Sequence, residues 1–308
     1  MSRASVVGML VAAEILIVGM AIYAVGHGSA SFAAGLHQVD FTGAPIAPIA
    51  AGATPHVVID DAESRVGVTL SNDDQVHVRD LTQIHGAIFS SRKYPALSVT
   101  RTVDGVRIER PRVSHLSIDI FDFSTQKIQV AVPAGSRLEI AQCGGADVDG
   151  VTGGVSVHSV DGHVTLTDLQ GSVDARSDDG YVRATNVHGD RLAMDSKDGH
   201  LEIHQVSVGS LSATTDDGRI EANDLSLSGE QPEANLHTGD GSIRLELAPN
   251  ANFTIAASTG DGRIYVDGSS QGDDDSAQRT IRLGAGAGRM TVGTSDGSIH
   301  ISTNGVFQ

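Results

Sequence analysis

The sequence predicts an all-β fold, a β-solenoid similar to a right-handed β-helix and built from stacked coils of about 18–23 residues. The main observation is a repeated phrase, Ser or Thr, any residue, then Asp-Gly, with successive copies 18, 19, 19, 23, 21 and 35 residues apart. Aliphatic residues alternate between the copies, which is typical of strands with one buried face. The phrases end in Asp161-Gly162, Asp179-Gly180, Asp198-Gly199, Asp217-Gly218, Asp240-Gly241, Asp261-Gly262 and Asp296-Gly297.

An earlier coil without the phrase is predicted 18 residues before the first copy. In this alignment apolar residues and glycines from Ala141 to Val157 take the positions of their counterparts, and Cys143 takes the place of the aspartate. A hidden copy at the same period indicates that the repeat is structural.

Each coil is expected to contain two alternating segments separated by two turns. Glycine suits the left-handed conformation of a tight turn, and the small hydroxyl residue before Asp-Gly can bond to nearby backbone. We therefore interpret the seven Asp-Gly pairs as structural turn residues and predict no catalytic, cofactor-binding or metal-binding residue. The sequence leaves open whether a coil has two faces or three.

The N-terminus, residues 1–28, is predicted to be a membrane anchor or a signal. Residues 6–25 are largely apolar and long enough to span a bilayer, interrupted by Glu14, and Arg3 would remain cytoplasmic. A cleaved signal is the alternative, because small residues at 29–33 offer a cleavage site. Glu14 is read as a tolerated polar residue in a single helix, or else as a contact with another membrane helix.

Three further segments follow the anchor. Residues 29–56, rich in Ala, Pro and Gly, are predicted to be a linker. Residues 57–140 alternate in short stretches and are predicted to form a β-rich lead-in or N-terminal cap. Residues 141–308 are predicted to be the solenoid, with a loop insertion at 267–280.

Charge narrows the possible partners. The net charge is −17, and residues 141–308 carry 25 acidic and 10 basic side chains. Such a surface repels phosphate backbones, so nucleic-acid binding is not expected. The single cysteine excludes an internal disulfide framework, and the absence of Trp removes the usual platforms for sugar stacking.

Two stretches carry a family resemblance. KIQVAVPAGSRLEIAQCGG (residues 127–145) followed by the repeated phrase, and LGAGAGRMTVGTSDGSIHIS (residues 283–302), resemble the DUF4097 family of β-strand-repeat proteins, whose members are often labelled adhesins. The similarity covers about residues 57–308. It implies a bacterial β-solenoid that faces the cell envelope, and the family brings no catalytic residues to carry over.

Three sets of side chains were weighed as possible sites. The aligned aspartates could form a calcium ladder, but the nonapeptide of calcium-binding β-rolls is absent, and turn formation is the simpler interpretation. The cluster Asp273–Asp275 is interpreted as solvated, with weak cation binding as the alternative. His163 and His200, two coils apart, and His204, farther along the strand from His200, do not give a zinc-binding spacing.

Paired acids raise the possibility of a glycan-active enzyme. Asp178-Asp179 and Asp216-Asp217 lie at corresponding turns two coils apart, but corner positions predict solvated carboxylates rather than an acid–base pair. The alternatives to a structural, adhesive or envelope-sensing role are therefore a polysaccharide-active β-helix enzyme and a calcium-stabilised surface structure.

The function expected from the sequence is that of a membrane-anchored, extracytoplasmic structural, adhesive or envelope-sensing β-solenoid. It is expected in the cytoplasmic membrane with one span and its bulk in the periplasm or at the cell surface. The expected partner is an unidentified envelope protein or surface ligand, bound without a cofactor.

Overall fold

The computed structural model describes residues 37–88, 95–111, 119–248, 251–267, 269–271 and 277–303. These residues form strands, turns and loops, and within them no helix occurs, so the predicted all-β class is confirmed. In the same ranges no helical segment has the length and hydropathy needed to cross a bilayer. The predicted anchor at residues 6–25 lies outside the described residues.

The chain divides into two compact units, each formed from separate stretches of sequence. The smaller unit takes residues 1–43, 81–96 and 111–126, and the larger takes 44–80, 97–110 and 127–308. In the smaller unit, three antiparallel strands pair in the order β1 (His37–Thr42), β6 (Gln83–Ile88) and β9 (Asp119–Thr125).

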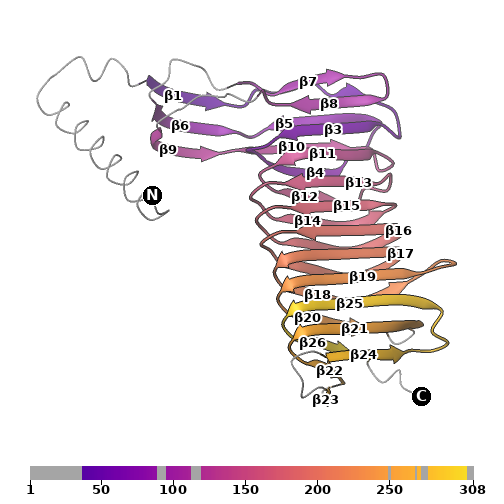
Figure 1. The fold of residues 1–308 in the computed structure, drawn as a ribbon. Helices are drawn as coiled ribbons and strands as arrows, with labels where there is room; N and C mark the ends of the chain where they lie inside the picture. Colours follow the sequence, from indigo (N-terminus) through magenta and orange to yellow (C-terminus); the bar gives the residue numbers. More distant parts are fainter. Residues whose placement is uncertain are drawn as a thin grey trace, which may run out of the picture. The chain divides into compact units, whose positions relative to one another are not determined.

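The larger unit is a solenoid with two long sides, named face 1 and face 2 (Figure 1). Two long strands, β16 (Val182–Ser196) and β17 (Leu201–Asp217), bend across both faces. Face 1 contains, in spatial order, β7 (Ser98–Arg101), β8 (Gly105–Glu109), β3 (His56–Asp61), β11 (Arg137–Cys143), β13 (Val155–Ser159), β15 (Val173–Ser177), the ends of β16 and β17, β19 (Glu233–Asp240), β25 (Gly288–Asp296), β21 (Phe253–Asp261) and β24 (Ala277–Arg282). Face 2 contains β2 (Ile49–Ala50), β5 (Gln75–Asp80), β10 (Lys127–Val132), β4 (Arg65–Leu70), β12 (Ala146–Asp149), β14 (Val164–Gln170), the starts of β16 and β17, β18 (Ile220–Leu227), β20 (Ile243–Leu247), β26 (Ile299–Ser302), β22 (Ile264–Val266) and β23 (Ser269–Gln271).

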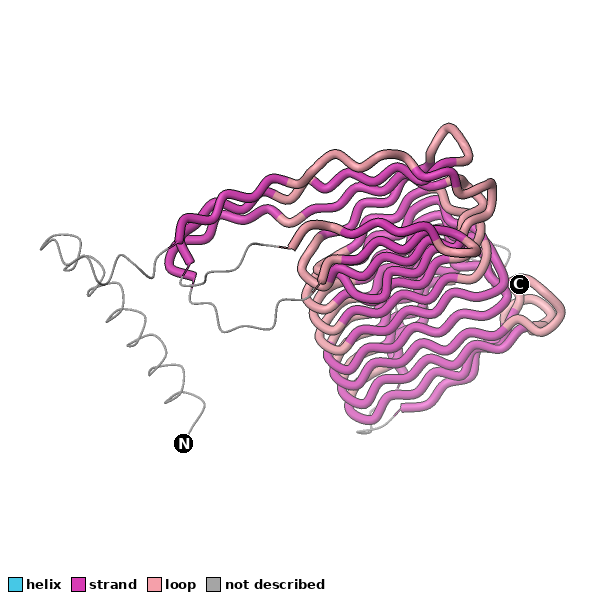
Figure 2. Tube along the Cα trace, turned by 90° about the horizontal axis from the view of Figure 1, so that it is seen from above, coloured by secondary structure: helices cyan, strands magenta, loops and turns pink. Residues whose placement is uncertain are grey.

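A short third side closes each central coil after face 2, and Figure 2 shows the coils from above. On this side Leu169 pairs with Val187, and Val187 pairs with Val206 of the next coil. The cross-section therefore has two long faces and one short side, a point the sequence left open.

Aliphatic side chains from all three sides fill the interior in successive layers. Val164, Leu166 and Leu169 of one coil are fully buried, and their counterparts Val182, Ala184 and Val187 lie in register above them. The predicted alternation of inward and outward residues holds across this register. Each fully buried aliphatic side chain contributes about 1.5–3 kcal/mol, so the layered core stabilises the stack.

The last coils do not follow the order of the sequence. Strand β25 pairs with β19 and with β21, and β26 pairs with β20 and with β22. The C-terminal coil thus lies between two coils that precede it in the chain. The expectation that each repeat stacks on its sequence neighbours is wrong here, because inter-strand bonds pair any coils whose side chains fit, whatever their separation along the chain.

Antiparallel strands border both ends of the stack. Strand β24 pairs antiparallel with β21, and β23 pairs antiparallel with β22. At the other end β7 pairs antiparallel with β8, and β2 with β5. Covering the terminal parallel coil in this way limits its edge-to-edge association with other molecules.

The Ser or Thr of the repeated phrase forms a buried column on face 1. Each side chain is at most 5% exposed, and from Ser177 onward its hydroxyl donates to a glycine carbonyl in the adjacent coil: Ser177 to Gly162 (3.1 Å), for example, and Thr215 to Gly199 (3.0 Å). The Ser159 hydroxyl donates instead to Gly162 of its own phrase (3.0 Å). In register, the column contains Asp61, Cys143, Ser159, Ser177, Ser196, Thr215, Thr238, Thr294 and Thr259. The hydroxyl therefore ties one coil to the next.

The glycine of the phrase is required by close approach between coils. A Cβ on Gly162, Gly199 or Gly218 would lie 1.8–2.0 Å from the carbonyl oxygen of the corresponding glycine in the preceding coil, and none of these three has a positive φ. The expected left-handed turn is therefore wrong for them. At these three positions the space between two coils, rather than backbone conformation, selects glycine, whereas Gly180, Gly262 and Gly297 also have a positive φ, between 146° and 155°.

The hydroxyl column leads to a stability prediction. Thr215→Val keeps the side-chain shape but leaves the Gly199 carbonyl without this donor, so we expect a loss of about 1 kcal/mol of unfolding free energy. The matched control is Thr214→Val, one residue away on the outer face, with an expected change within about 0.5 kcal/mol. Urea denaturation compares the two; equal losses would contradict the assigned role of the hydroxyl.

Candidate functional site

The seven aspartates of the repeated phrase all lie at the turn that follows face 1. Every one is exposed, and they occupy corresponding turns in successive coils. In the described residues no group of three or more His, Cys, Asp or Glu side chains is placed to hold a metal ion. The seven are Asp161, Asp179, Asp198, Asp217, Asp240, Asp261 and Asp296.

Cys143 does not take the place of an aspartate. An irregularity between Ile140 and Cys143 shifts the register, so Cys143 pairs with Ser159 and enters the buried hydroxyl column. The thiol donates to the His158 carbonyl (3.5 Å), and burial raises the pKa of Cys143. A neutral, buried thiol fits a structural role rather than a nucleophilic one.

The paired acids are separated by a lysine. Asp178, Lys197 and Asp216 occupy the same position in three successive coils, so the lysine lies between the two acidic turns. The Lys197 ammonium lies 2.8 Å from Asp178 and is the main reason that the pKa of Asp178 is lowered. A general acid needs a raised pKa, so this arrangement does not form the acid–base pair of a glycosidase.

The histidines bond to neighbouring coils. His163 stacks on Tyr181 at 4.0 Å, the Nδ1 atom of His200 accepts from the Arg219 amide, and His204 lies 3.3 Å from Asn223. These contacts account for the histidines without a metal. Asp273–Asp275 lie outside the described residues.

A column of left-handed residues at the corner after face 2 was missed by the sequence analysis. Asp168, Asn186, Gln205 and Asp224 have φ between 53° and 56°, and Gly150 occupies the same corner with φ 81°. The sequence did contain a signal for this corner. Four of the residues lie seven positions after the Asp of their phrase and Gly150 lies seven after Cys143, and Gly, Asn and Asp favour the left-handed conformation. The side chains stack, with Asn186 donating to Asp168.

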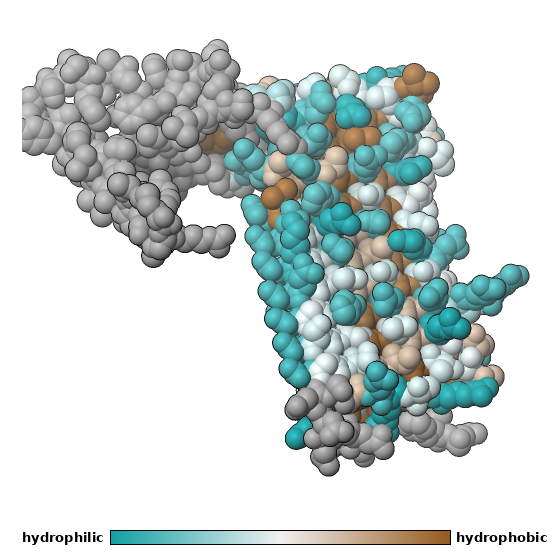
Figure 3. Space-filling model, viewed as in Figure 1, coloured by the Kyte–Doolittle hydropathy of each residue, from teal (hydrophilic) through white to brown (hydrophobic). Residues whose placement is uncertain are grey.

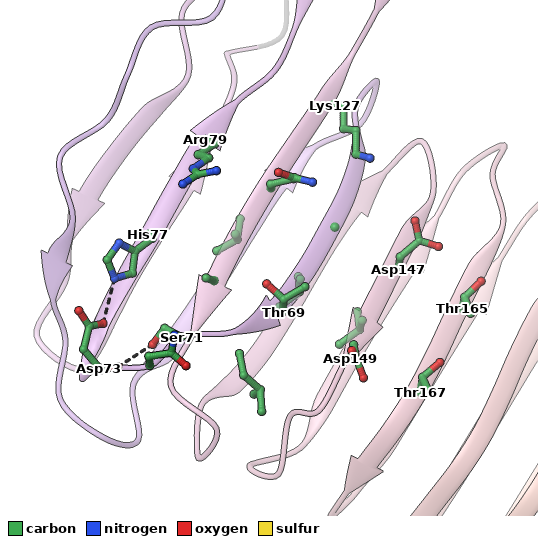
Figure 4. Close-up of a pocket in the computed structure, with 18 residues that line it drawn as sticks. Thr69, Ser71, Asp73, His77, Arg79, Lys127, Asp147, Asp149, Thr165 and Thr167 are labelled. Carbon is green, nitrogen blue, oxygen red and sulfur yellow. Dashed lines mark hydrogen bonds and ion pairs between the residues drawn. The ribbon is translucent and has the colours of Figure 1, made fainter.

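A hollow lies on the outer side of face 2 in the larger unit, and we call it the face 2 groove. It has a volume of about 740 Å³ and crosses β5, β10, β4, β12 and β14. Polar side chains from these strands point into it (Figure 4). The lining includes Gly67, Thr69, Leu70, Ser71, Asp73, His77, Arg79, Lys127, Gln129, Ala131, Asp147, Asp149, Thr165 and Thr167.

The groove is hollow because its central outward positions are small. Gly67 pairs with Gln129 on one side and Asp147 on the other, and a Cβ on Gly67 would meet nothing nearer than 3.9 Å. Thr69 and Ala131 lie opposite each other in the next row. Since successive strands lie about 4.8 Å apart, larger side chains on the outer strands form walls around this floor.

Ion pairs fix part of the groove. Arg65 donates from two nitrogens to the two oxygens of Asp147, both at 2.9 Å. His77 lies 2.9 Å from Asp73, and this contact is the main reason that the pKa of Asp73 is lowered. These pairs hold Asp147 and Asp73 in place while other lining side chains remain available.

Farther along face 2, an ion pair between coils gives a pH prediction. The Arg183 guanidinium donates to Glu202 at 2.6 Å and is the main cause of the lowered pKa of Glu202. A folded-state pKa below the unfolded value of about 4.3 stabilises the fold above that pH, and the contribution is lost as the pH falls through the lowered value. We expect Arg183→Gln to raise the pKa of Glu202.

Carbon-13 NMR titration of Glu202 checks that shift, and unfolding at about pH 7 and about pH 2.5 checks the linkage. The variant should be less stable than the parent at the higher pH and equal to it at the lower. Arg176→Gln, which removes a more exposed pair with Asp195 at 3.4 Å, is the control. An unchanged Glu202 titration would contradict the prediction.

The outer surface visible in Figure 3 is mostly polar, with apolar side chains seen between the polar ones. Together with the buried hydroxyl column on face 1 and the open face 2 groove, this surface defines the class of protein: an all-β solenoid with polar outer faces. The chain belongs to the Toastrack DUF4097 family, whose model matches residues 55–302.

Two solved structures are similar over most of the chain. A "putative adhesin" from Bacteroides fragilis is 14% identical, with 87% of this chain and 96% of that chain covered and a TM-score of 0.41. A "putative cell adhesion protein" from Clostridium sporogenes is 8% identical, with 87% and 98% covered and a TM-score of 0.26. No curated protein matches the chain.

Proposed function

We propose that this protein is a non-catalytic binding scaffold of the cell envelope, with a structural or adhesive role. Residues 6–25 anchor it in the cytoplasmic membrane, and the solenoid lies on the extracytoplasmic side. The observation that carries the proposal is the face 2 groove, an open polar hollow on a stack of coils held rigidly in register.

The rigid stack supports a binding role. Two long faces of parallel strands present outward side chains in fixed rows, and the hydroxyl column fixes the rows relative to each other. Sites built on such elements are more precise than sites built on loops. The exposed aspartates and the separated acid pairs offer no acid–base machinery, which favours binding over catalysis.

Binding is tested with the purified full chain in detergent micelles, passed over surfaces coated with peptidoglycan, exopolysaccharide or envelope protein extract. We expect saturable binding to at least one coating and no release of reducing ends from the polysaccharides. Failure to bind every coating would overturn the proposed role, and turnover of any polysaccharide would overturn its non-catalytic character.

Topology is tested with reporters fused to the C-terminus. Alkaline phosphatase, which is active only after export, should be active, and a fluorescent protein that folds only in the cytoplasm should be dark. The reverse pattern would overturn the extracytoplasmic placement.

Calcium removal is expected to leave stability unchanged. The aspartates of the repeat lie one to a coil at exposed turns, and calcium prefers six to eight oxygen ligands around one ion. The melting temperature in chelator and in millimolar calcium should therefore coincide. A higher melting temperature with calcium would favour the calcium-stabilised alternative.

A further inference from the structure

Two cationic side chains in the face 2 groove have no counter-ion in the described part of the chain. Arg79 on β5 and Lys127 on β10 line the groove, and neither forms an ion pair or side-chain hydrogen bond with a described residue. The neighbouring charges differ: Arg65 is held by Asp147, and His77 by Asp73. In a chain with a net charge of −17, two such cations on adjacent strands are available to an anion.

The position of Gln129 shows that Arg79 and Lys127 lie near each other on the same side of face 2. Gln129 pairs directly with Arg79 across the antiparallel pair and lies two residues beyond Lys127, so all three point to the same side of face 2. Figure 4 shows Arg79 and Lys127 toward the same end of the groove. An anionic group there would meet two positive charges with the Gln129 amide beside them. Lys127 pairs in register with Arg65, which is bound to Asp147, and His77 lies two residues before Arg79 on β5.

The rest of the groove is suited to hydroxyl-bearing rings. Thr69, Thr165 and Thr167 present hydroxyls, and Asp149, which has no partner among the described residues, presents a carboxylate acceptor. Leu70, 45% exposed, adds an apolar surface at the groove. Sugar rings carry hydroxyl groups at their edges, which can bond to the threonines and Asp149, and weakly apolar faces, which can contact Leu70.

We infer that the face 2 groove binds an acidic oligosaccharide, with its carboxylate or sulfate at Arg79 and Lys127 and its sugar hydroxyls along the threonines and Asp149. Charge complementarity places the anion, and the width of five strands, about 19 Å from β5 to β14, accommodates several sugar units. A peptide is less suited, because the outward lining offers only Leu70 and Ala131 as apolar contacts for its side chains.

This inference rests on the proposed binding role, and its test uses short soluble ligands. Isothermal titration calorimetry of the full chain is performed with a galacturonate hexamer, its fully methyl-esterified form, a sulfated oligosaccharide and inorganic phosphate. We expect binding of the galacturonate or the sulfated oligomer, at least tenfold weaker binding of the neutral ester, and no measurable binding of phosphate at the same concentration.

Variants locate the site. Arg79→Gln and Lys127→Gln should each weaken binding at least fivefold, and Thr167→Val should weaken it less. Arg191→Gln removes an exposed cation of face 1 that likewise has no partner among the described residues, and it should leave affinity unchanged. Circular-dichroism melting verifies that each variant remains folded.

Several outcomes would overturn the inference: no acidic oligosaccharide binds, the ester binds as tightly, phosphate binds as tightly, or Arg191→Gln weakens binding as much as Arg79→Gln. The two proposals fail separately. If the full chain binds a coated surface while Arg79→Gln and Lys127→Gln have no effect, the scaffold role stands and the groove inference falls. If oligosaccharides bind in the groove but no coated surface is bound, the groove inference stands and the scaffold role in the envelope falls.

Discussion

Gly199→Ala is expected to lose on the order of 3 kcal/mol of unfolding free energy, the upper end of what overpacking costs. The new Cβ would lie 1.8 Å from the Gly180 carbonyl oxygen and 2.6 Å from the Ser196 hydroxyl. The two coils cannot separate to make room, because parallel hydrogen bonds on both faces join them. Urea denaturation measures the loss.

The control for this prediction is Gly67→Ala. A Cβ at Gly67 meets its nearest atoms at 3.9 Å, and the backbone there is not left-handed, so we expect a change within about 0.5 kcal/mol. Hydrogen exchange should show the Gly199→Ala loss concentrated in the coils around Gly180 and Gly218, because solenoid coils interact mainly with their neighbours. Equal stability of the two variants would contradict the close-approach explanation.

The second large effect is expected for Arg110→Met, with a loss of about 3–5 kcal/mol. Arg110 is buried, and its guanidinium donates to Asp61 at 2.7 Å and to Asp80 at 3.0 Å. Both carboxylates are also buried, so removing the cation leaves two negative charges close together in a poorly solvated site. Chemical denaturation of the full chain measures the loss.

A matched exposed pair separates burial from charge. Arg65→Met breaks a pair with Asp147 that is about half exposed, and exposed pairs contribute at most about 1 kcal/mol. Adding Asp61→Asn and Asp80→Asn to Arg110→Met should recover part of the lost stability, since the uncompensated charges are then gone. A loss for Arg110→Met no larger than that for Arg65→Met would contradict the role of burial.

The repeat and its inward residues were predictable because they depend on local pattern. The period placed Val164, Leu166 and Leu169 in the core, as the structure confirms. The same reasoning failed at Cys143, where an irregularity in β11 shifts the register and the thiol fills a hydroxyl position. A constant period cannot reveal a local change in pairing.

The candidate site was not predictable from the repeat. The face 2 groove brings together β5, β10, β4, β12 and β14, and of these only β12 and β14 belong to the repeats that the sequence analysis aligned. Arg79 meets Gln129 across an antiparallel pair 50 residues apart in the chain. Such pairing depends on how the strands before the first coil return to the stack, and no periodic signal encodes that return.

The sequence by itself determined the solenoid class, the inward aliphatic positions and the turns, because each depends on spacing within one coil. The tertiary structure alone decided the two long faces and short side, the last coil inserted between earlier ones, the buried Asp61–Arg110–Asp80 cluster and the groove on face 2. These features depend on which coils lie next to each other. Backbone hydrogen bonds can form between any two strands whatever their side chains, so the packing of side chains in three dimensions selects the neighbours.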